Sequence, residues 1–257
     1  MTTTLVVANQ KGGVAKTTSV ACIGAALAEL GQRVLLVDLD PQACLTFSLG
    51  IDPEDVDLSL HEVLLGQVGL AEVIMATEDG PDLVPASIEL AGAETALLSR
   101  ADRDSCLRAA LEDVDKGYDW VMLDCPPSLG VLTVAALTAA DALLIPLQCE
   151  TLSHRGVGQL LDTVHDVRRF TNRTLEILGV LPTLYDRRTT HARAVLETIS
   201  GTYGLPVLGP PIPKSIRFAE APAVGRSILS TARSHPGAGA YREVARTLLD
   251  SRGQTRR

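Results

Sequence analysis

A loop containing two adjacent glycines joins a buried strand to a helix near the start of this 257-residue chain, and it restricts the fold more than any other feature. The run Thr4–Ala8 (TLVVA) is typical of a buried strand, and the Ala-rich run Thr17–Leu30 is typical of a helix. The loop between them reads NQKGGVAKTT. A strand that turns through glycines into a helix N-terminus is the usual setting of a phosphate-binding loop. The sequence therefore predicts an α/β fold built around such a loop.

Short aliphatic runs and helical patterns alternate along the rest of the chain. The expected strands cover Thr4–Ala8, Val34–Val37, Leu83–Pro85, Trp120–Leu123, Ala142–Pro146, Ile177–Leu184 and Leu205–Leu208. The expected helices cover Thr17–Leu30, Ile88–Leu98, Ser105–Val114, Leu132–Ala140, Val157–Phe170, Ala192–Tyr203 and Gly239–Leu249, with short helices in Leu60–Met75. This alternation predicts one α/β domain over residues 1–257, a P-loop NTPase with a mostly parallel twisted sheet and helices on both faces. Residues 252–257 are expected to be a frayed tail.

Composition excludes several other classes. Aromatic residues make up 3% of the chain, which argues against a protein that binds single strands by stacking their bases. The five cysteines are scattered and form no C-x-x-C pair, so a disulfide scaffold and a zinc ribbon are disfavoured and a reducing cytoplasm is expected. No apolar run is long enough to span a membrane, and no membrane partner is expected.

The side chains of the loop suit a polyphosphate. Gly12 and Gly13 let the backbone turn its N–H groups toward phosphate oxygens. Lys16 can reach β- and γ-phosphates, and the Thr17 hydroxyl can ligate Mg²⁺. The alternative is a glycine turn that is followed by an ordinary helix start.

Two positions depart from the strict pattern G-x-x-x-x-G-K-[ST], because Gln10 and Ala15 replace its glycines. The segment instead resembles the deviant Walker A motif, K-G-G-x-x-K-T-T, of the ParA/MinD superfamily. The resemblance implies ATP binding by Lys11, Gly12, Gly13, Val14, Ala15, Lys16, Thr17 and Thr18. In that family the signature lysine, here Lys11, reaches the partner's phosphates in a nucleotide-sandwich homodimer. Ala15 replaces the commoner glycine, and we expect a negative φ there, as at a helix start, so that its methyl is tolerated.

Acidic residues follow two of the expected strands. VLLVDLD places Asp38 and Asp40 at the end of one strand, and WVMLDCPPS places Asp124 at the end of another, where open α/β sheets bind ligands. These segments resemble the family's switch I and Walker B segments, and Asp40 would then orient the attacking water. The resemblance implies a catalytic set of Lys11, Lys16 and Asp40 and a metal set of Thr17, Asp38, Asp40 and Asp124. For Asp38 and Asp40, the alternative is a pair of solvated turn acids. Cys125 is expected to be a buried hydrophobic residue.

Two later segments extend the resemblance. ALLIPLQCE is similar to the family's P-x-Q-x-E segment, which implies a contact between Glu150 and the partner's Lys11. PIPKSIRFAEAP (Pro211–Pro222) resembles the stretch that closes over adenine and would place Pro213 and Ser215 against the base. Serine replaces the asparagine that is usual there. The alternative is a proline-rich surface loop.

Charge is divided unevenly along the chain, whose net charge is −8. Residues 1–150 hold 7 Lys and Arg against 23 Asp and Glu, a net charge of −16, whereas residues 151–257 hold 16 against 8, a net charge of +8. A basic half fits a polyanion partner, although a solvated basic face would have the same composition. The resemblance implies non-specific binding of double-stranded DNA by the ATP-bound dimer. The candidate DNA contacts are Arg187, Arg188, Lys214, Arg217, Arg226 and Arg233.

The resemblance extends from Thr4 to about Leu249 and implies a ParA/Soj-type chromosome- or plasmid-partitioning ATPase in the nucleoid, stimulated by a ParB-like centromere-binding protein. A MinD-like membrane-cycling ATPase needs an amphipathic C-terminal helix, and Ser251–Arg257 contains no large apolar residue. A metal-cluster carrier of the superfamily needs paired cysteines. An ATPase that positions another cargo is an alternative that the sequence does not separate.

Overall fold

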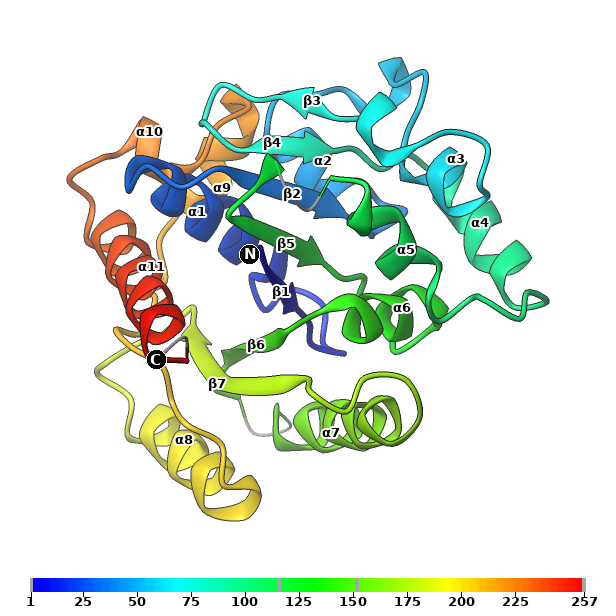
Figure 1. Cartoon of the computed structure of the whole chain (residues 1–257). Coiled ribbons are helices and arrows are strands. Elements are labelled where there is room, and N and C mark those ends of the chain that lie inside the picture. The colour runs from blue at the N-terminus through cyan, green and yellow to red at the C-terminus, as the bar shows by residue number, and fades with distance from the viewer. Residues whose placement is uncertain (1, 115–116, 151–152, 256–257) are drawn as a thin grey trace.

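Seven strands form one sheet in the order β3-β4-β2-β5-β1-β6-β7 in the computed structural model, which describes residues 2–114, 117–150 and 153–255 (Figure 1). The strands are β1 (Thr3–Val7), β2 (Val34–Asp38), β3 (Met75–Ala76), β4 (Asp82–Val84), β5 (Trp120–Asp124), β6 (Ala142–Gln148) and β7 (Glu176–Thr183). All pairings are parallel except that of β3 with β4. The central strands β1, β2 and β5 are aliphatic because helices cover both of their faces.

Helices pack on both sides of the sheet, which confirms the expected fold class. The α-helices are α1 (Lys16–Glu29), α2 (Cys44–Ser48), α3 (Leu60–Leu64), α4 (Leu90–Leu97), α5 (Cys106–Glu112), α6 (Val131–Ala139), α7 (Ser153–Phe170), α8 (Thr190–Tyr203), α9 (Arg217–Glu220), α10 (Ile228–Thr231) and α11 (Pro236–Thr255). The 3₁₀ helices are η1 (Pro53–Asp55), η2 (Leu70–Glu72) and η4 (Ala221–Val224). Among the described residues, no helix has the length and apolarity that crossing a membrane would require.

Each face of the sheet has its own hydrophobic core. On one face, α1 packs against α11, and the Ser19 hydroxyl lies 3.0 Å from the hydroxyl of the fully buried Tyr241. On the other face, α3 to α7 cover the sheet with aliphatic side chains such as Leu132 and Leu160 (Figure 1). The loop that precedes α1 is therefore held between two packed layers.

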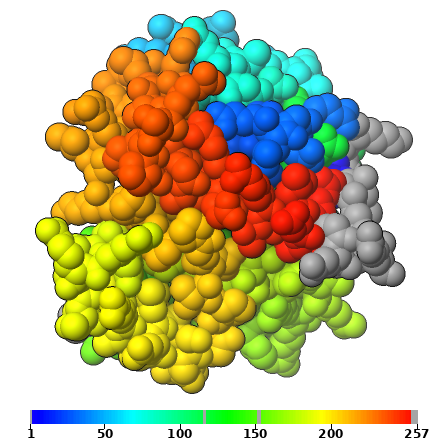
Figure 2. All heavy atoms as spheres, turned by 90° about the vertical axis from the view of Figure 1, so that its left-hand side faces the viewer, coloured from blue at the N-terminus to red at the C-terminus, as the bar shows by residue number. Residues whose placement is uncertain are grey.

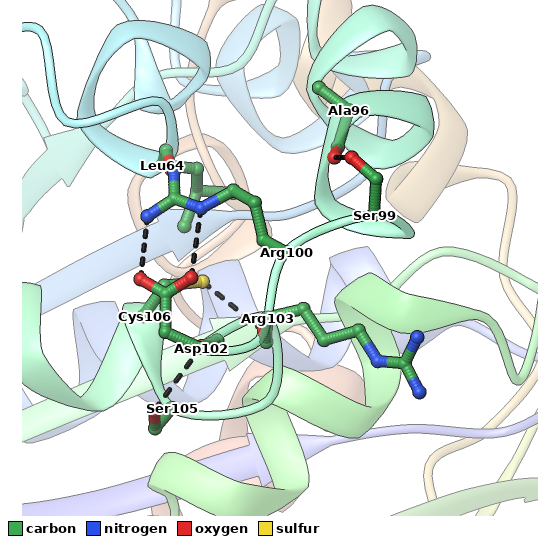
Figure 3. A network of polar contacts seen from close by, with 8 residues as sticks. All are labelled: Leu64, Ala96, Ser99, Arg100, Asp102, Arg103, Ser105 and Cys106. Carbon is green, nitrogen blue, oxygen red and sulfur yellow. Dashed lines mark hydrogen bonds and ion pairs between the residues drawn. The ribbon is translucent and has the colours of Figure 1, made fainter.

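A polar network fixes the connection between α4 and α5 on the second face (Figure 3). The Arg100 guanidinium donates hydrogen bonds to both carboxylate oxygens of Asp102 at 2.9 and 2.6 Å, and its third nitrogen donates to the carbonyl of Leu64 at 2.9 Å. These bonds join the end of α3 to the start of α5. Because α5 packs against α6, the network supports the helix that follows the β5 loop.

The structure differs from the expected elements in two places. In the region expected to fray, α11 continues as a helix to Thr255, and residues 256–257 lie outside the described part of the chain. The Arg252 guanidinium lies 5.3 Å from the centre of the Trp120 ring, and this cation–π contact holds the end of the helix against the sheet. In addition, Leu205–Leu208 forms only an isolated bridge between Val207 and Val180, because Pro210 and Pro211 have no N–H groups with which to extend a ladder.

Candidate active site

The loop between β1 and α1 is anchored on both sides. The side-chain amide of Asn9 donates to the carbonyl of Pro146 in β6 at 2.7 Å, and its side-chain oxygen accepts a hydrogen bond from the Lys11 N–H at 3.0 Å. The Thr183 hydroxyl at the end of β7 donates to the carbonyl of Val14 at 2.9 Å. The backbone is thus held open over the start of α1, which is the shape that a polyphosphate requires.

Ala15 adopts a left-handed conformation, with φ 63° and ψ 37°, immediately before α1. The negative φ that we expected at this position is therefore wrong. An L-residue with a Cβ is strained in this region, and a glycine would adopt it freely. The strain follows from the loop anchors, because Val14 is held by Thr183 while Lys16 already belongs to the helix.

Lys16 lies beneath the loop and is 7% exposed. Its Nζ donates to the Lys11 carbonyl at 3.3 Å. Burial lowers the pKa of Lys16, while Asp124, and more weakly Asp40, act in the opposite direction. The ammonium is therefore partly desolvated, and a phosphate is a suitable counter-charge for it.

Asp38 and Asp124 lie side by side, because they are register partners at the carboxyl ends of β2 and β5. Both are fully buried. Asp38 is hydrogen-bonded, accepting from the backbone N–H and the hydroxyl of Thr46 at 2.9 and 2.8 Å. Burial nevertheless raises the pKa of Asp38 to about 6.

Within the described part of the chain, neither carboxylate oxygen of Asp124 has a hydrogen-bond partner. Burial, and then the charge of Asp38, raise the pKa of Asp124 well above its ordinary value, while the nearby Thr17 hydroxyl lowers it without a well-formed hydrogen bond. A buried carboxylate without a donor is costly unless a cation or water meets it.

These residues fit Mg²⁺. Asp124 and Thr17 offer oxygen ligands or contacts to bound water, and Asp38 adds negative charge beside them. Over residues 2–114, 117–150 and 153–255, no cluster of three or more His, Cys, Asp or Glu residues could enclose a metal by itself. Mg²⁺ usually keeps several waters and takes its remaining ligands from the phosphates.

Asp40 lies at the edge of this group and is half-buried. Its backbone N–H donates to Asp38 at 3.1 Å, and its carboxylate accepts from the N–H of Gln42 at 3.0 Å. The charge of Asp40 acts weakly to raise the pKa of Lys16. The next turn contains Ala43 with φ 51°, a second strained position beside the site.

Lys11 forms an ion pair with Glu150 of the same chain. The Lys11 side chain is 37% exposed, so it lies at the rim of the loop whereas Lys16 lies beneath it. A cavity of about 500 Å³ opens beside it, lined by Asn9, Gln10, Lys11, Val14, Pro127, Leu147, Gly156 and Gln159. The signature lysine thus faces an open hollow next to the phosphate loop.

The Pro211–Pro222 segment curves around the start of α1. Pro213 forms a bridge with Tyr185, just beyond the end of β7, and Phe218 shares a small cavity with Thr18. Ser215 lies between these two points and is hydrogen-bonded to His235 and to the backbone of Arg217. Part of the segment therefore packs beside the first turns of α1.

The six basic candidates divide into two groups. The first group lies at the carboxyl end of the sheet and consists of Arg187, Arg188, Lys214 and Arg217. In the second group, Arg226 pairs with Glu78 and lines a small cavity with Thr18 and Phe218, and Arg233 influences the pKa of Glu29 at the C-terminal end of α1. Figure 2 shows the segments that carry both groups, in yellow and orange, on one face of the molecule.

Sequence reasoning missed four residues that shape the site: Asn9, Thr46, Thr183 and His235. Asn9 directly follows the first strand, so a polar residue at a strand end could have revealed it. The other three act through contacts that are distant in sequence, and no local pattern marks them. Cys125 is buried in the core as expected.

Comparison with curated proteins gives relatives over nearly the whole chain. A family model described as an AAA domain matches residues 2–177. The sporulation initiation inhibitor protein Soj of Bacillus subtilis is 42% identical over 94% of this chain and 96% of its own length. The chromosome partitioning protein ParA of Caulobacter vibrioides is 42% identical over 95% of this chain and 93% of its own length.

Solved structures give the same fold with nucleotide bound. A Mycobacterium smegmatis structure, described as cobyrinic acid a,c-diamide synthase with an ATP analogue and magnesium, is 56% identical, with a TM-score of 0.88 over 97% of this chain and 95% of that one. An ATP complex of a McdA variant from Cyanothece is 26% identical, with a TM-score of 0.88 over 97% of this chain and 96% of that one. The nucleotide-binding machinery of these structures and the loop described above therefore belong to one architecture.

Proposed function

Because the chain belongs to the ParA/Soj family and is an ATPase that uses ATP and Mg²⁺, we propose that it partitions DNA through an ATP-dependent dimer. One observation carries the proposal most directly. Two lysines serve one loop from different positions, Lys16 buried beneath it and Lys11 at its rim beside an open cavity. A second copy of the chain would place a phosphate within reach of the outer lysine.

Hydrolysis is assigned to residues around the loop. Lys16 and the loop N–H groups hold the phosphates and offset the charge that develops on the transferred phosphoryl group. Asp40, which is half-buried at the end of the β2 segment, orients the attacking water. Mg²⁺ supplies electrostatic stabilisation of the phosphates when bound, and Thr17, Asp38 and Asp124 would hold it or its waters.

Dimerisation is assigned to Lys11 and Glu150. Within one chain the Lys11 ammonium and the Glu150 carboxylate form an ion pair with each other. An exposed ion pair of this kind is worth about 1 kcal/mol or less, so Lys11 can leave Glu150 at little cost when a partner's phosphate is offered. Glu150 would then accept the partner's Lys11, and two in-chain contacts would become two contacts between chains.

Non-specific DNA binding is assigned to Arg187, Arg188, Lys214 and Arg217, the basic group at the carboxyl end of the sheet. All four side chains are exposed, and their ion pairs with Asp186 and Glu220 are surface pairs that phosphates can replace. Dimerisation at the loop edge would bring two such groups together. We further infer a cytoplasmic, nucleoid-associated protein whose ATP hydrolysis is stimulated by a ParB-like partner.

Two other functions are less well supported. A MinD-like membrane cycle needs a free amphipathic C-terminal helix, but α11 buries Tyr241, Val244 and Leu248 against α1. The M. smegmatis name points to amide formation. This chain's similarity to Soj and ParA over nearly its whole length favours partitioning instead.

The test is retention of double-stranded DNA by the purified protein without nucleotide, with ADP and with ATP, over a series of salt concentrations. We expect retention with ATP only, and a steep fall with salt. Arg217→Glu should weaken retention and lower the slope of log affinity against log salt by about two, one phosphate contact for each protomer.

The controls separate the steps. Arg233→Glu, in the second basic group, changes the same charge and should leave retention nearly intact. Lys16→Ala should remove both ATP binding and retention. Equal retention in all three nucleotide states would contradict the proposal. If Arg217→Glu and Arg233→Glu reduced DNA retention equally, the assignment of DNA binding to the group that contains Arg217 would be wrong.

A further inference from the structure

A second cavity, of about 320 Å³, lies at the end of the sheet opposite to the phosphate loop. It opens where β1, β5, β6 and β7 begin and where α11 approaches its end (Figure 1). Trp120 lines it at the amino end of β5, whereas Asp124 lies at the carboxyl end of the same strand. At a rise of about 3.3 Å per residue, the two are about 13 Å apart along the strand. The cavity is therefore separate from the nucleotide site.

Part of the cavity wall is aliphatic. Ala142 and Leu248 are buried, and Leu178 is half-buried. All three belong to the core that α1 and α11 form with the sheet. Sites for small ligands usually have volumes of about 300–1,000 Å³ and mostly apolar walls, so this cavity has the size for a small molecule with a short aliphatic part.

A second part of the wall offers hydrogen-bond donors. Trp120 is 2% exposed, and its indole N–H has no hydrogen-bond acceptor among the residues that the structure describes. The Arg252 guanidinium lines the same cavity and lies 5.3 Å from the centre of the indole ring. A buried donor without an acceptor is costly, and a ligand that brings an acceptor removes this cost. A carboxylate suits both an indole N–H and a guanidinium.

The rim of the cavity carries two carboxylates. Asp141 directly precedes β6 and Glu176 begins β7, and the Glu176 N–H donates to the Asp141 carbonyl at 2.9 Å. The Asp141 side chain is anchored, because one of its oxygens accepts a hydrogen bond from the Thr4 N–H at 2.8 Å. Both residues are exposed, and in the described part of the chain neither forms an ion pair. Two neighbouring carboxylates of this kind favour an ammonium group.

We propose that this cavity binds a free α-amino acid with an aliphatic side chain, in its zwitterionic form. The ammonium group meets the two carboxylates at the rim. The carboxylate meets the indole N–H of Trp120 and the guanidinium of Arg252, and the side chain packs against Leu178 and Leu248. An amine without a carboxylate would leave the buried indole N–H without an acceptor. A carboxylate without an ammonium would bring a third negative charge beside the two acids. The lining therefore selects a ligand that carries both charges.

The experiment titrates the full chain with L-leucine and follows the fluorescence of Trp120, the only tryptophan in the sequence. We expect a saturable change in emission, and calorimetric titration then gives the dissociation constant. Two matched compounds separate the charges. Leucinamide keeps the ammonium and the side chain but has no carboxylate, and 4-methylpentanoate keeps the carboxylate and the side chain but has no ammonium. Each should bind at least about tenfold more weakly than leucine, because each leaves one set of charged hydrogen bonds unmade.

Variants of the lining test the assignment of the two charges. Glu176→Gln removes one rim charge at an exposed position and should weaken leucine binding about fivefold, the worth of an exposed ion pair, without weakening 4-methylpentanoate. The control is Glu112→Gln, the same change at an exposed position of α5 on the other face of the sheet, which should leave leucine binding unchanged. Trp120→Phe keeps an aromatic ring but has no N–H, and it should weaken leucine binding about tenfold in calorimetry.

Three results would overturn the inference. The first is the absence of a saturable change at about 10 mM leucine, where a ligand with a dissociation constant of about 1 mM would be about nine-tenths bound. The second is equal affinity for leucine and leucinamide, which would show that the carboxylate is not recognised. The third is an equal effect of Glu176→Gln and Glu112→Gln on leucine binding. ATP-dependent DNA retention is measured separately, so failure of this inference is distinguishable from failure of the proposed function.

Discussion

Replacing Ala15 with glycine should stabilise the protein, even though glycine normally weakens the start of a helix. Ala15 has φ 63° and ψ 37°. The left-handed conformation costs an L-residue about 1–2 kcal/mol, which glycine avoids. Glycine is also more flexible than alanine in the unfolded chain, which reduces the gain in the free energy of unfolding by about 0.4–1 kcal/mol. The free energy of unfolding should therefore rise by about 0.5–1 kcal/mol, and Tm by about 1–4 °C.

The assay is urea and thermal denaturation without nucleotide, because a bound ligand would add its own stabilisation. Two controls isolate the backbone term. Gly13 has φ +73° and open space where a Cβ would lie, so Gly13→Ala should lower the free energy of unfolding by about 1 kcal/mol or more without any clash. Ala28, which is half-buried within α1, has ordinary helical geometry, and Ala28→Gly should be destabilising by about 0.5–1 kcal/mol.

The refuting result is equally clear. If Ala15→Gly lowers the free energy of unfolding as Ala28→Gly does, the conformation of Ala15 is not a source of strain. The loop anchors at Asn9 and Thr183 would then not force the left-handed conformation.

Three further outcomes follow from the site and its surroundings. Lys11→Ala should abolish ATP-dependent dimerisation, measured by light scattering. It should change the ATP dissociation constant by no more than about threefold, because in the single chain Lys11 pairs with Glu150 at the surface. Loss of ATP binding in this variant would contradict the prediction. Asp40→Ala should slow phosphate release by about 100-fold or more and trap the ATP-bound dimer, whereas unmodified turnover would remove Asp40 from the mechanism. Glu29 accepts two hydrogen bonds from Arg242, and these lower the pKa of Glu29 in the folded protein. The ion pair therefore stabilises the fold fully above the pKa of Glu29 in the unfolded chain, about 4.5. This stabilisation is lost as the pH falls through the lower pKa of the folded state. Glu29→Gln should accordingly lower the free energy of unfolding by about 0.5–1 kcal/mol at pH 7, and denaturation at pH 3 should show a smaller difference; a constant difference would contradict the ion pair.

Local patterns predicted the parts of the fold that depend on sequence neighbours. The parallel sheet followed from the alternation of aliphatic runs with helical ones, and the side-by-side placement of Asp38 and Asp124 follows from two acids that each end a strand. The phosphate loop was predictable because strand, glycines and helix are contiguous.

Contacts between distant segments were not predictable. The conformation of Ala15 depends on anchors in β6 and β7, which no pattern within the loop reveals. The helical end of α11 depends on the contact of Arg252 with Trp120, far away in sequence.

Strand order also determines when the loop can take shape during synthesis. β1 is made first, yet its two neighbours are β5 (Trp120–Asp124) and β6 (Ala142–Gln148). The Asn9 anchor likewise waits for Pro146. Such distant pairing is slow to form, and until it forms β1 is an unpaired edge. We therefore expect the loop to reach its folded shape only after β6 has left the ribosome, so that incomplete chains would not compete for nucleotide.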